Sequence, residues 1–196
     1  MNADVPKFDL VIAGVGGQGA ILASDIIGKA AVKSGFPVRA AETHGMAQRG
    51  GSVVNHVRIG RDLGSMVPVS GADLLLALDP VEALRYLKYL SKDGVIVMNT
   101  KQVYPVTVTC GSDIYPEVPE IIATLENMHI VKALNAFELA LEAGNAQSMN
   151  VVMVGAASNY IPVAEDLLIQ CIKEMVPPKT IDINFRAFEL GRDEID

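Results

Sequence analysis

Short apolar runs alternate with segments of helical periodicity along most of the chain. Runs of strand length predict β-strands, and apolar residues that recur at three- and four-residue spacing predict helices. The predicted strands are 8–13, 37–41, 52–59, 73–78, 95–98 and 130–134. The predicted helices are about 17–34, 81–90 and a short one around 116–125, and the chain from residue 135 on is mainly helical, with breaks at 159–162 and 177–178.

This alternation predicts an α/β fold, namely a Rossmann-like, doubly wound, mainly parallel sheet with a helical C-terminal third. The 196 residues are half hydrophobic, which is enough for a sizeable core, and we expect residues 1–196 to form a single domain. Such a composition also favours a permanent surface for a partner. The formal net charge of −7 and the lack of a Lys/Arg cluster argue against nucleic acid as that partner.

The chain has only two cysteines, Cys110 and Cys171, and no CxxC motif. An iron–sulfur cluster ligated within this chain is therefore excluded, and a disulfide framework is not expected. We expect each cysteine to be a small apolar core residue. Residues 1–4 lack a signal-peptide pattern and no apolar run is long enough to span a membrane, so the predicted location is cytoplasmic, away from membranes.

A glycine-rich turn follows the first predicted strand directly and leads into the first predicted helix. Its candidate residues are Gly14, Gly16, Gly17, Gln18 and Gly19. In one interpretation, backbone N–H groups at the helix N-terminus bind a pyrophosphate and Glu42 binds a ribose hydroxyl. In the other, which we favour, the glycines only permit a close turn and tight packing of the helix against the strand. Gln18 is compatible with contacts to a ligand, a partner subunit or its own loop.

A long polar, glycine-rich loop without apolar periodicity is predicted over 42–51, and such loops are often functional. Its candidate residues are Glu42, His44, Gln48, Arg49, Gly50 and Gly51. The guanidinium of Arg49 suits a carboxylate or a phosphate, and His44 can titrate near neutral pH or donate a hydrogen bond. The alternative is a solvated loop in which Arg49 merely pairs with Glu42.

The remaining polar candidates favour structural roles. His56 and His129 have no second ligand at metal spacing, so no metal site is predicted. Asp79 follows an apolar strand and is expected to cap the helix that starts near Val81. Asn99 and Thr100 are placed similarly, and the sequence contains no nucleophile elbow, no GxxxxGK[ST] motif and no HExxH motif.

The turn at 14–19 together with the run 42–53, which reads ETHGMAQRGGSV, resembles the gamma-type subunit of 2-oxoacid:ferredoxin oxidoreductases. Within that family the resemblance is greatest to the indolepyruvate branch. The late stretch 184–191, NFRAFELG, resembles the closing helix of the family, so the resemblance covers nearly the whole chain. The glycine turn alone is unspecific, whereas the HGMAQRGG run joined to it is quite specific.

The resemblance implies one subunit of a larger enzyme that decarboxylates a 2-oxoacid on thiamine diphosphate, passes electrons through iron–sulfur clusters to ferredoxin and transfers the acyl group to coenzyme A. A larger partner subunit carries the thiamine diphosphate and the clusters, and this chain binds no cofactor alone. The candidate catalytic residues His44 and Arg49 then face the partner's active site or the coenzyme A path. Pyruvate-type members have a more acidic stretch where this chain has Met46–Arg49, which implies an arylpyruvate substrate.

Two other functions are compatible with the same residues. One is a stand-alone Rossmann oxidoreductase or regulatory module, in which the glycine turn and Glu42 bind NAD, NADP or FAD. The other is a plain homodimer of this chain without a cofactor.

Overall fold

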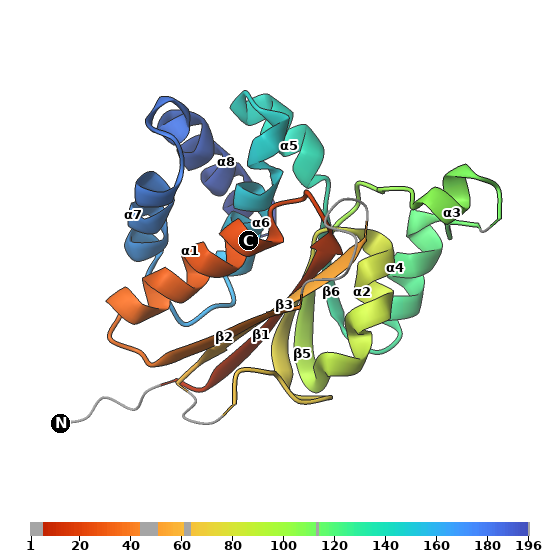
Figure 1. Cartoon of the computed structure of the whole chain (residues 1–196), viewed down its shortest axis with the longest axis horizontal. Coiled ribbons are helices and arrows are strands. Elements are labelled where there is room, and N and C mark those ends of the chain that lie inside the picture. Colours follow the sequence, from red (N-terminus) through yellow and green to blue (C-terminus); the bar gives the residue numbers. More distant parts are fainter. Residues whose placement is uncertain (1–5, 44–50, 61–63, 113, 196) are drawn as a thin grey trace.

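A six-stranded sheet forms the centre of the computed structural model, which describes residues 6–43, 51–60, 64–112 and 114–195 (Figure 1). The strands are β1 (Phe8–Val15), β2 (Val38–Thr43), β3 (Ser52–Ile59), β4 (Ala72–Ala77), β5 (Leu90–Asn99) and β6 (Ile130–Leu134). The α-helices are α1 (Ala20–Lys33), α2 (Pro80–Tyr86), α3 (Val106–Thr109), α4 (Val118–Glu126), α5 (Ala136–Ala143), α6 (Met149–Ser158), α7 (Glu165–Met175) and α8 (Ile181–Asp193). Three short 3₁₀ turns accompany them, η1 (Leu87–Tyr89), η2 (Ala146–Ser148) and η3 (Pro178–Thr180).

The strand order is β2-β3-β1-β4-β5-β6, and the predicted mainly parallel α/β sheet is confirmed. β1, β4, β5 and β6 pair in parallel, whereas β3 is antiparallel to both of its neighbours, β1 and β2. The connection from β1 through α1 to β2 therefore passes over β3, which is inserted between the two parallel strands. The hydrophobic pattern predicts the strands but carries no information on this insertion.

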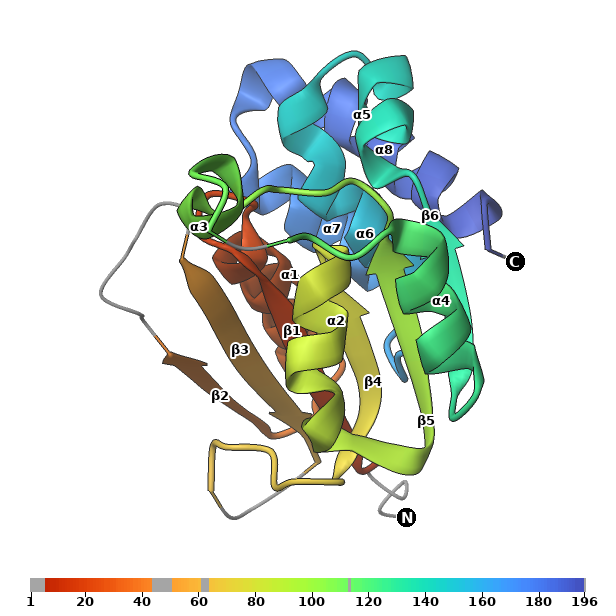
Figure 2. The ribbon, with the colours of Figure 1, turned by 90° about the vertical axis from the view of Figure 1, so that its right-hand side faces the viewer.

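Helices cover both faces of the sheet (Figure 2). Leu10 and Ile12 of β1 pack with α1 and with the C-terminal helices, whereas Val11 and Ala13 face the opposite side, towards α2 and α4. Successive strand residues point to opposite faces, so a strand covered on both sides is apolar at every position. This explains why β4 is apolar at every position from Leu74 to Ala77.

Glycine conformations set both ends of the first helix. The helix begins at Ala20 rather than near residue 17, since Gly19 has a left-handed backbone (φ 79°) that cannot continue an α-helix. It ends at Lys33, and Gly35 (φ 83°) follows its cap as predicted, with the N–H of Phe36 donating to the carbonyl of Ala31 at 3.1 Å.

The region between α2 and β5 differs in detail from the prediction. The helix predicted over 81–90 ends at Tyr86 and is followed by η1, and the strand predicted at 95–98 already begins at Leu90. The register of β4 against β5 shifts between Ala72 and Leu74, opposite Gly94. A Cβ at Gly94 would lie closer than 3.0 Å to Leu90 and to the Ala72 carbonyl, so glycine permits this irregularity.

The two cysteines have different environments. Cys171 is buried in α7, as expected, but the expectation that Cys110 is a core residue is wrong, because Cys110 is exposed just after the one-turn helix α3. In the described part of the chain, no helix has the length and apolar character needed to cross a membrane.

Helices α6 and α8 cross at very short distance. A Cβ at Gly155 of α6 would lie closer than 3.0 Å to the carbonyl of Phe188, and a Cβ at Gly191 of α8 equally close to the carbonyl of Val152. Every residue from Met149 to Ala157 is buried, since α6 packs against α1, α5, α8 and β5. The two glycines therefore bring the C-terminal helix into contact with the core.

We predict that Gly155→Ala and Gly191→Ala each lower the free energy of unfolding by about 3 kcal/mol, because the added methyl group must push two backbones apart. The matched control is Gly28→Ala in the middle of α1, where the nearest atom to the new Cβ is Val38 Cγ1 at 3.8 Å. That variant should be more stable by about 0.5–1 kcal/mol. Urea unfolding measures all three, and equal effects at the three glycines would contradict the close crossing.

Candidate functional site

The carboxyl ends of β1, β4 and β5 lie at one edge of the sheet, where ligands bind in folds of this kind. The glycine turn follows β1 at this edge. Because β3 is antiparallel to β1, its first residue, Ser52, pairs with the last residue of β1, Val15. The glycine turn and the end of the polar loop, two separate candidates in the sequence, are thus neighbours.

The side chain of Gln18 closes the glycine turn from within. Its Oε1 accepts a hydrogen bond from the N–H of Val15 at 2.7 Å, and its Nε2 donates to the carbonyl of Leu78 at 3.0 Å. A Cβ at Gly14 would lie closer than 3.0 Å to Gln18 Oε1. Of the three roles that the sequence allows for Gln18, the geometry shows contacts with its own loop and with the end of β4.

The other glycines of the turn allow close approaches. The N–H of Gly16 donates to the carbonyl of Gly51 at 2.8 Å, which joins the turn to the end of the polar loop. At Gly19 a Cβ would collide with the side chain of Asn150, whose Nδ2 donates to the Gly19 carbonyl at 3.2 Å. Gly17 has φ 104°, and a Cβ there would meet no described atom within 4 Å, so only its backbone conformation requires glycine. These contacts agree with the packing interpretation of the turn.

Part of the polar loop lies outside the described residues, namely His44, Gln48, Arg49 and Gly50. The sequence pattern places Glu42 at the start of this loop, but Glu42 lies on β2, where it is exposed and pairs with Asn55 of β3. In a dinucleotide-binding sheet the strand with the ribose-binding acid is next to the first strand. Here β3 separates β2 from β1. This arrangement does not match the geometry expected for Glu42 as a ribose ligand.

Ser52 fixes the end of the polar loop to α2. Its hydroxyl donates a short hydrogen bond to Oε2 of Glu82 and lies 3.0 Å from the hydroxyl of Tyr86. Nε of Arg85 donates to the other carboxylate oxygen of Glu82 at 3.1 Å. Burial raises the pKa of Glu82, and the hydrogen bond from Ser52 and the charge of Arg85 oppose that rise.

Asp79 connects a third loop to the same edge. It caps α2 as predicted, since Oδ1 accepts from the N–H of Val81 at 3.0 Å. Oδ1 also accepts from the Tyr115 hydroxyl at 2.8 Å, and Oδ2 accepts from the N–H of Val103 at 2.8 Å. Burial raises the pKa of Asp79, while these hydrogen bonds lower it, and burial next to Asp79 raises the pKa of Tyr115. The segment after β5 is thus held at the end of β4.

The remaining polar candidates also have structural contacts. Asn99 is fully buried, and its side chain bonds to the carbonyl of Leu78 and to the N–H groups of Lys101 and Ala136. The Thr100 hydroxyl donates to the carbonyl of Leu134.

His56 lies in the core, where Nδ1 accepts from the N–H of Val67 at 3.3 Å and the ring stands edge-on to Tyr89. Burial lowers the pKa of His56. His129 is half-buried. The described residues contain no group of three His, Cys, Asp or Glu side chains arranged to hold a metal ion.

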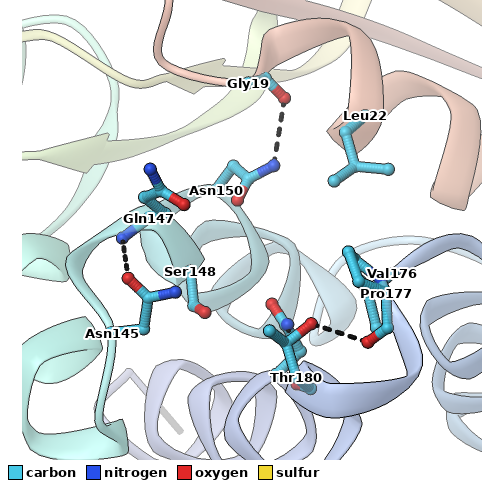
Figure 3. A pocket seen from close by; sticks show the side chains of 10 residues that line it. Gly19, Leu22, Asn145, Gln147, Ser148, Asn150, Val176, Pro177 and Thr180 are labelled. Atoms are coloured by element: carbon cyan, nitrogen blue, oxygen red, sulfur yellow. Dashed lines mark hydrogen bonds between the residues drawn. The ribbon is translucent and has the colours of Figure 1, made fainter.

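A cavity of about 270 Å³ lies beside Gly19, on the face of the sheet covered by α1 and α6 (Figure 3). Its lining residues are Gly19, Leu22, Asn145, Gln147, Ser148, Asn150, Val176, Pro177, Thr180 and Asn184. Only Gly19 among them is a sequence candidate, because the others come from separate elements that the fold alone brings together.

We predict that Gln18→Ala lowers the free energy of unfolding by about 2–4 kcal/mol, because it leaves the Val15 N–H and the Leu78 carbonyl without their partner. The matched control is Gln170→Ala on α7, where the amide bonds only to the exposed Glu174. That change should stay within about 0.5 kcal/mol of the parent chain. If chemical unfolding shows Gln18→Ala to be as stable as Gln170→Ala, the closed turn is not a structural element.

Known proteins resemble this chain over almost its full length. The family model described as pyruvate ferredoxin/flavodoxin oxidoreductase matches residues 9–194. Indolepyruvate oxidoreductase subunit IorB of Thermococcus kodakarensis is 46% identical over 190 residues, 94% of each chain. The subunit of the same name from Archaeoglobus fulgidus is 44% identical over 188 residues, again 94% of each chain.

The fold also has a counterpart among solved structures. Pyruvate oxidoreductase subunit PORC from Thermotoga maritima superimposes with a TM-score of 0.76 at 24% identity, and the match covers 97% of both chains. Together, the family match over residues 9–194 and the 46% identical relative establish that the chain belongs to the pyruvate ferredoxin/flavodoxin oxidoreductase family, as a small subunit of a 2-oxoacid:ferredoxin oxidoreductase.

Proposed function

We propose that this chain is the small subunit of a thiamine diphosphate-dependent arylpyruvate:ferredoxin oxidoreductase whose substrate class includes indolepyruvate. The observation that carries the proposal is the 46% identity, over 94% of both chains, to a subunit named for indolepyruvate. The reaction converts a 2-oxoacid, coenzyme A and two oxidised ferredoxins into acyl-coenzyme A, carbon dioxide, a proton and two reduced ferredoxins. The stretch Met46–Arg49, which lacks acidic residues, supports an arylpyruvate rather than pyruvate.

The partner in this proposal is a larger subunit that carries thiamine diphosphate and the iron–sulfur clusters. This chain's two cysteines are too few for a four-cysteine cluster, and they differ in burial, with Cys171 inside α7 and Cys110 at the surface. When bound to the partner, thiamine diphosphate stabilises the carbanion formed by decarboxylation. Ferredoxin then receives electrons from the complex, and this chain holds none of these groups by itself.

We place this chain's contribution at the carboxyl edge of its sheet. Three loops meet there, and each is tied to the sheet or to its neighbour by hydrogen bonds in which Gln18 and Asp79 accept and Ser52 donates. A rigid edge of this kind can present the loop of residues 42–51 to the partner's active site. In this arrangement Arg49 neutralises a substrate carboxylate or a coenzyme A phosphate, and His44 donates a hydrogen bond or transfers a proton.

The remaining candidates of the polar loop, Glu42, Gln48, Gly50 and Gly51, contact a ligand or the partner in this proposal. Those of the glycine turn, Gly14, Gly16, Gly17, Gln18 and Gly19, shape the edge that carries this loop. We also propose that residues 1–196 form a single gamma-type domain, that the complex is cytoplasmic, and that the isolated chain forms a homodimer.

The closed turn under Gln18 and the position of β2 do not favour a stand-alone NAD-binding module.

We predict that the chain, combined with its larger subunit, supports indolepyruvate-dependent reduction of ferredoxin or viologen in the presence of coenzyme A, with a kcat/KM at least roughly tenfold above that for pyruvate. Arg49→Ala should lower kcat/KM about 10- to 100-fold, the value of one or two charge-assisted hydrogen bonds. The control is Arg39→Ala, which removes an exposed arginine on β2.

Two results would contradict different parts of this proposal. Absence of any 2-oxoacid-dependent activity in a complex that assembles would overturn the function. Full activity of Arg49→Ala, together with full activity of the Arg39→Ala control, would remove the guanidinium from the mechanism and leave the subunit role intact.

A further inference from the structure

The loop between β3 and β4 is attached to the sheet by two side chains of β3. Its described part, residues 64–71, lies at the end of the sheet opposite the glycine turn, because β3 runs antiparallel to β1 (Figure 2, at the bottom). Nδ1 of His56 accepts a hydrogen bond from the N–H of Val67 at 3.3 Å. Nη1 of Arg58 donates to two backbone carbonyls of the loop, both at 3.3 Å. His56 and Arg58 together hold the loop against the sheet.

The conformation of this loop depends on these attachments. Val67 is only 2% exposed and packs in the core between the sheet and α2, whereas Met66 and Val69 are 44% and 64% exposed. Ser70 has a left-handed backbone (φ 58°), which is unfavourable for a residue with a side chain. Its N–H donates to the carbonyl of Lys88 at 2.9 Å. A loop with few buried side chains and a strained residue opens locally when one of its attachments is lost.

The hydrogen bond from Val67 fixes the protonation state of His56. A ring nitrogen that accepts from an N–H carries no proton, so the neutral ring has its proton on Nε2. Nε2 is buried and has no hydrogen-bond partner among the described residues. A second proton would bind to Nδ1 and place an N–H against the N–H of Val67. It would also put a positive charge on a side chain that is fully buried. Protonation of His56 and the hydrogen bond from Val67 therefore exclude each other.

The surroundings of His56 also oppose its protonation. Burial and the positive charge of Arg58, two positions along the same face of β3, lower the pKa of His56 from its ordinary value of 6.5. The buried or half-buried carboxylates of the neighbouring elements accept from other groups, and they are Asp9 of β1, Asp73 of β4 and Glu82 of α2. The other charged side chains of these elements are exposed, namely Arg39 and Glu42 of β2, Arg85 of α2 and Lys88 of η1. The titratable rings on this side are Tyr89, edge-on to His56, and Tyr86, stacked on Tyr89.

We propose that His56 is an acid-sensitive latch for the loop between β3 and β4. The neutral ring accepts from the Val67 N–H and keeps the loop closed, whereas the protonated ring releases it, so that residues 64–69 open and Val67 leaves the core. The closed form binds fewer protons than the open form. Its stability is therefore fully present above a pH of about 6.5 and falls as the pH decreases below that value. The latch lies at the opposite end of the sheet from the polar loop, so it does not depend on the proposed function.

Amide hydrogen exchange of the full chain between about pH 8 and about pH 5 tests the latch. The quantity compared is the protection factor, the ratio of the intrinsic to the measured exchange rate, which already contains the pH dependence of the chemical step. We expect the protection factor of the Val67 N–H to fall at least roughly tenfold towards acid pH. The reference amides are Leu78 and Thr100, which donate to backbone carbonyls at 2.7 and 2.9 Å, and their protection should change less than about twofold. Ring nitrogen NMR shifts should show an unprotonated Nδ1 in His56 at about pH 8 that is lost together with the protection.

Two variants separate the latch from other effects of pH. His56→Asn keeps an acceptor oxygen near the place of Nδ1 but does not titrate, so the protection of Val67 should change less than about threefold over the same pH range. His129→Asn, the matched control at a half-buried histidine, should retain the pH dependence of the parent chain. If His56→Asn does not fold, the ring nitrogen shifts of the parent chain decide.

Four results would overturn the proposal. They are equal protection of Val67 at both ends of the pH range, a proton on Nδ1 of His56 at about pH 8, an undiminished pH effect in folded His56→Asn, and equal losses at Leu78 and Thr100. The last result would indicate unfolding of the whole chain by acid rather than the opening of one loop.

Discussion

The amide of Gln18 joins the end of β1 to the end of β4, and the arrangement of the whole carboxyl edge depends on this connection. One side chain satisfies a backbone donor, the Val15 N–H, and a backbone acceptor, the Leu78 carbonyl. Both groups lie just where two parallel strands stop pairing, so without the amide they would be left for solvent or a ligand. Gly14 is required because any side chain there would collide with the amide. The turn is thus filled by the protein's own atoms.

The same principle operates at the two neighbouring loops. Glu82 holds Ser52 at the end of the polar loop, and Asp79 holds Tyr115 and Val103 of the segment after β5. Both carboxyl groups are buried, and burial raises the pKa of each, which shows the electrostatic cost of placing them there. Several hydrogen bonds to each carboxyl group offset that cost. Loops that are attached in this way can present residues to another subunit without changing their own conformation. This is the role proposed for this chain in its complex.

Local patterns predict much of this structure. The predicted strands 52–59 and 130–134 agree with β3 and β6 at both ends, and the cap at Asp79 follows from its position after an apolar strand. Contacts between distant residues cannot be predicted in this way, as for Tyr115, which is 36 positions from Asp79. The insertion of β3 between β1 and β2 escapes prediction because strand order depends on long-range pairing, and it changes the interpretation of Glu42. The exposed position of Cys110 escapes prediction because composition alone cannot locate a short helix such as α3.

In the proposed complex, the carboxyl edge of the sheet meets the larger subunit. Backbone hydrogen exchange of the full chain, alone and in the complex, tests this contact. We expect the amides of residues 42–51 and 100–112 to exchange at least roughly tenfold more slowly in the complex, while those of α7 and of the edge strand β6 stay unchanged. Protection confined to β6 or α7, with unchanged exchange at 42–51 and 100–112, would contradict the claim.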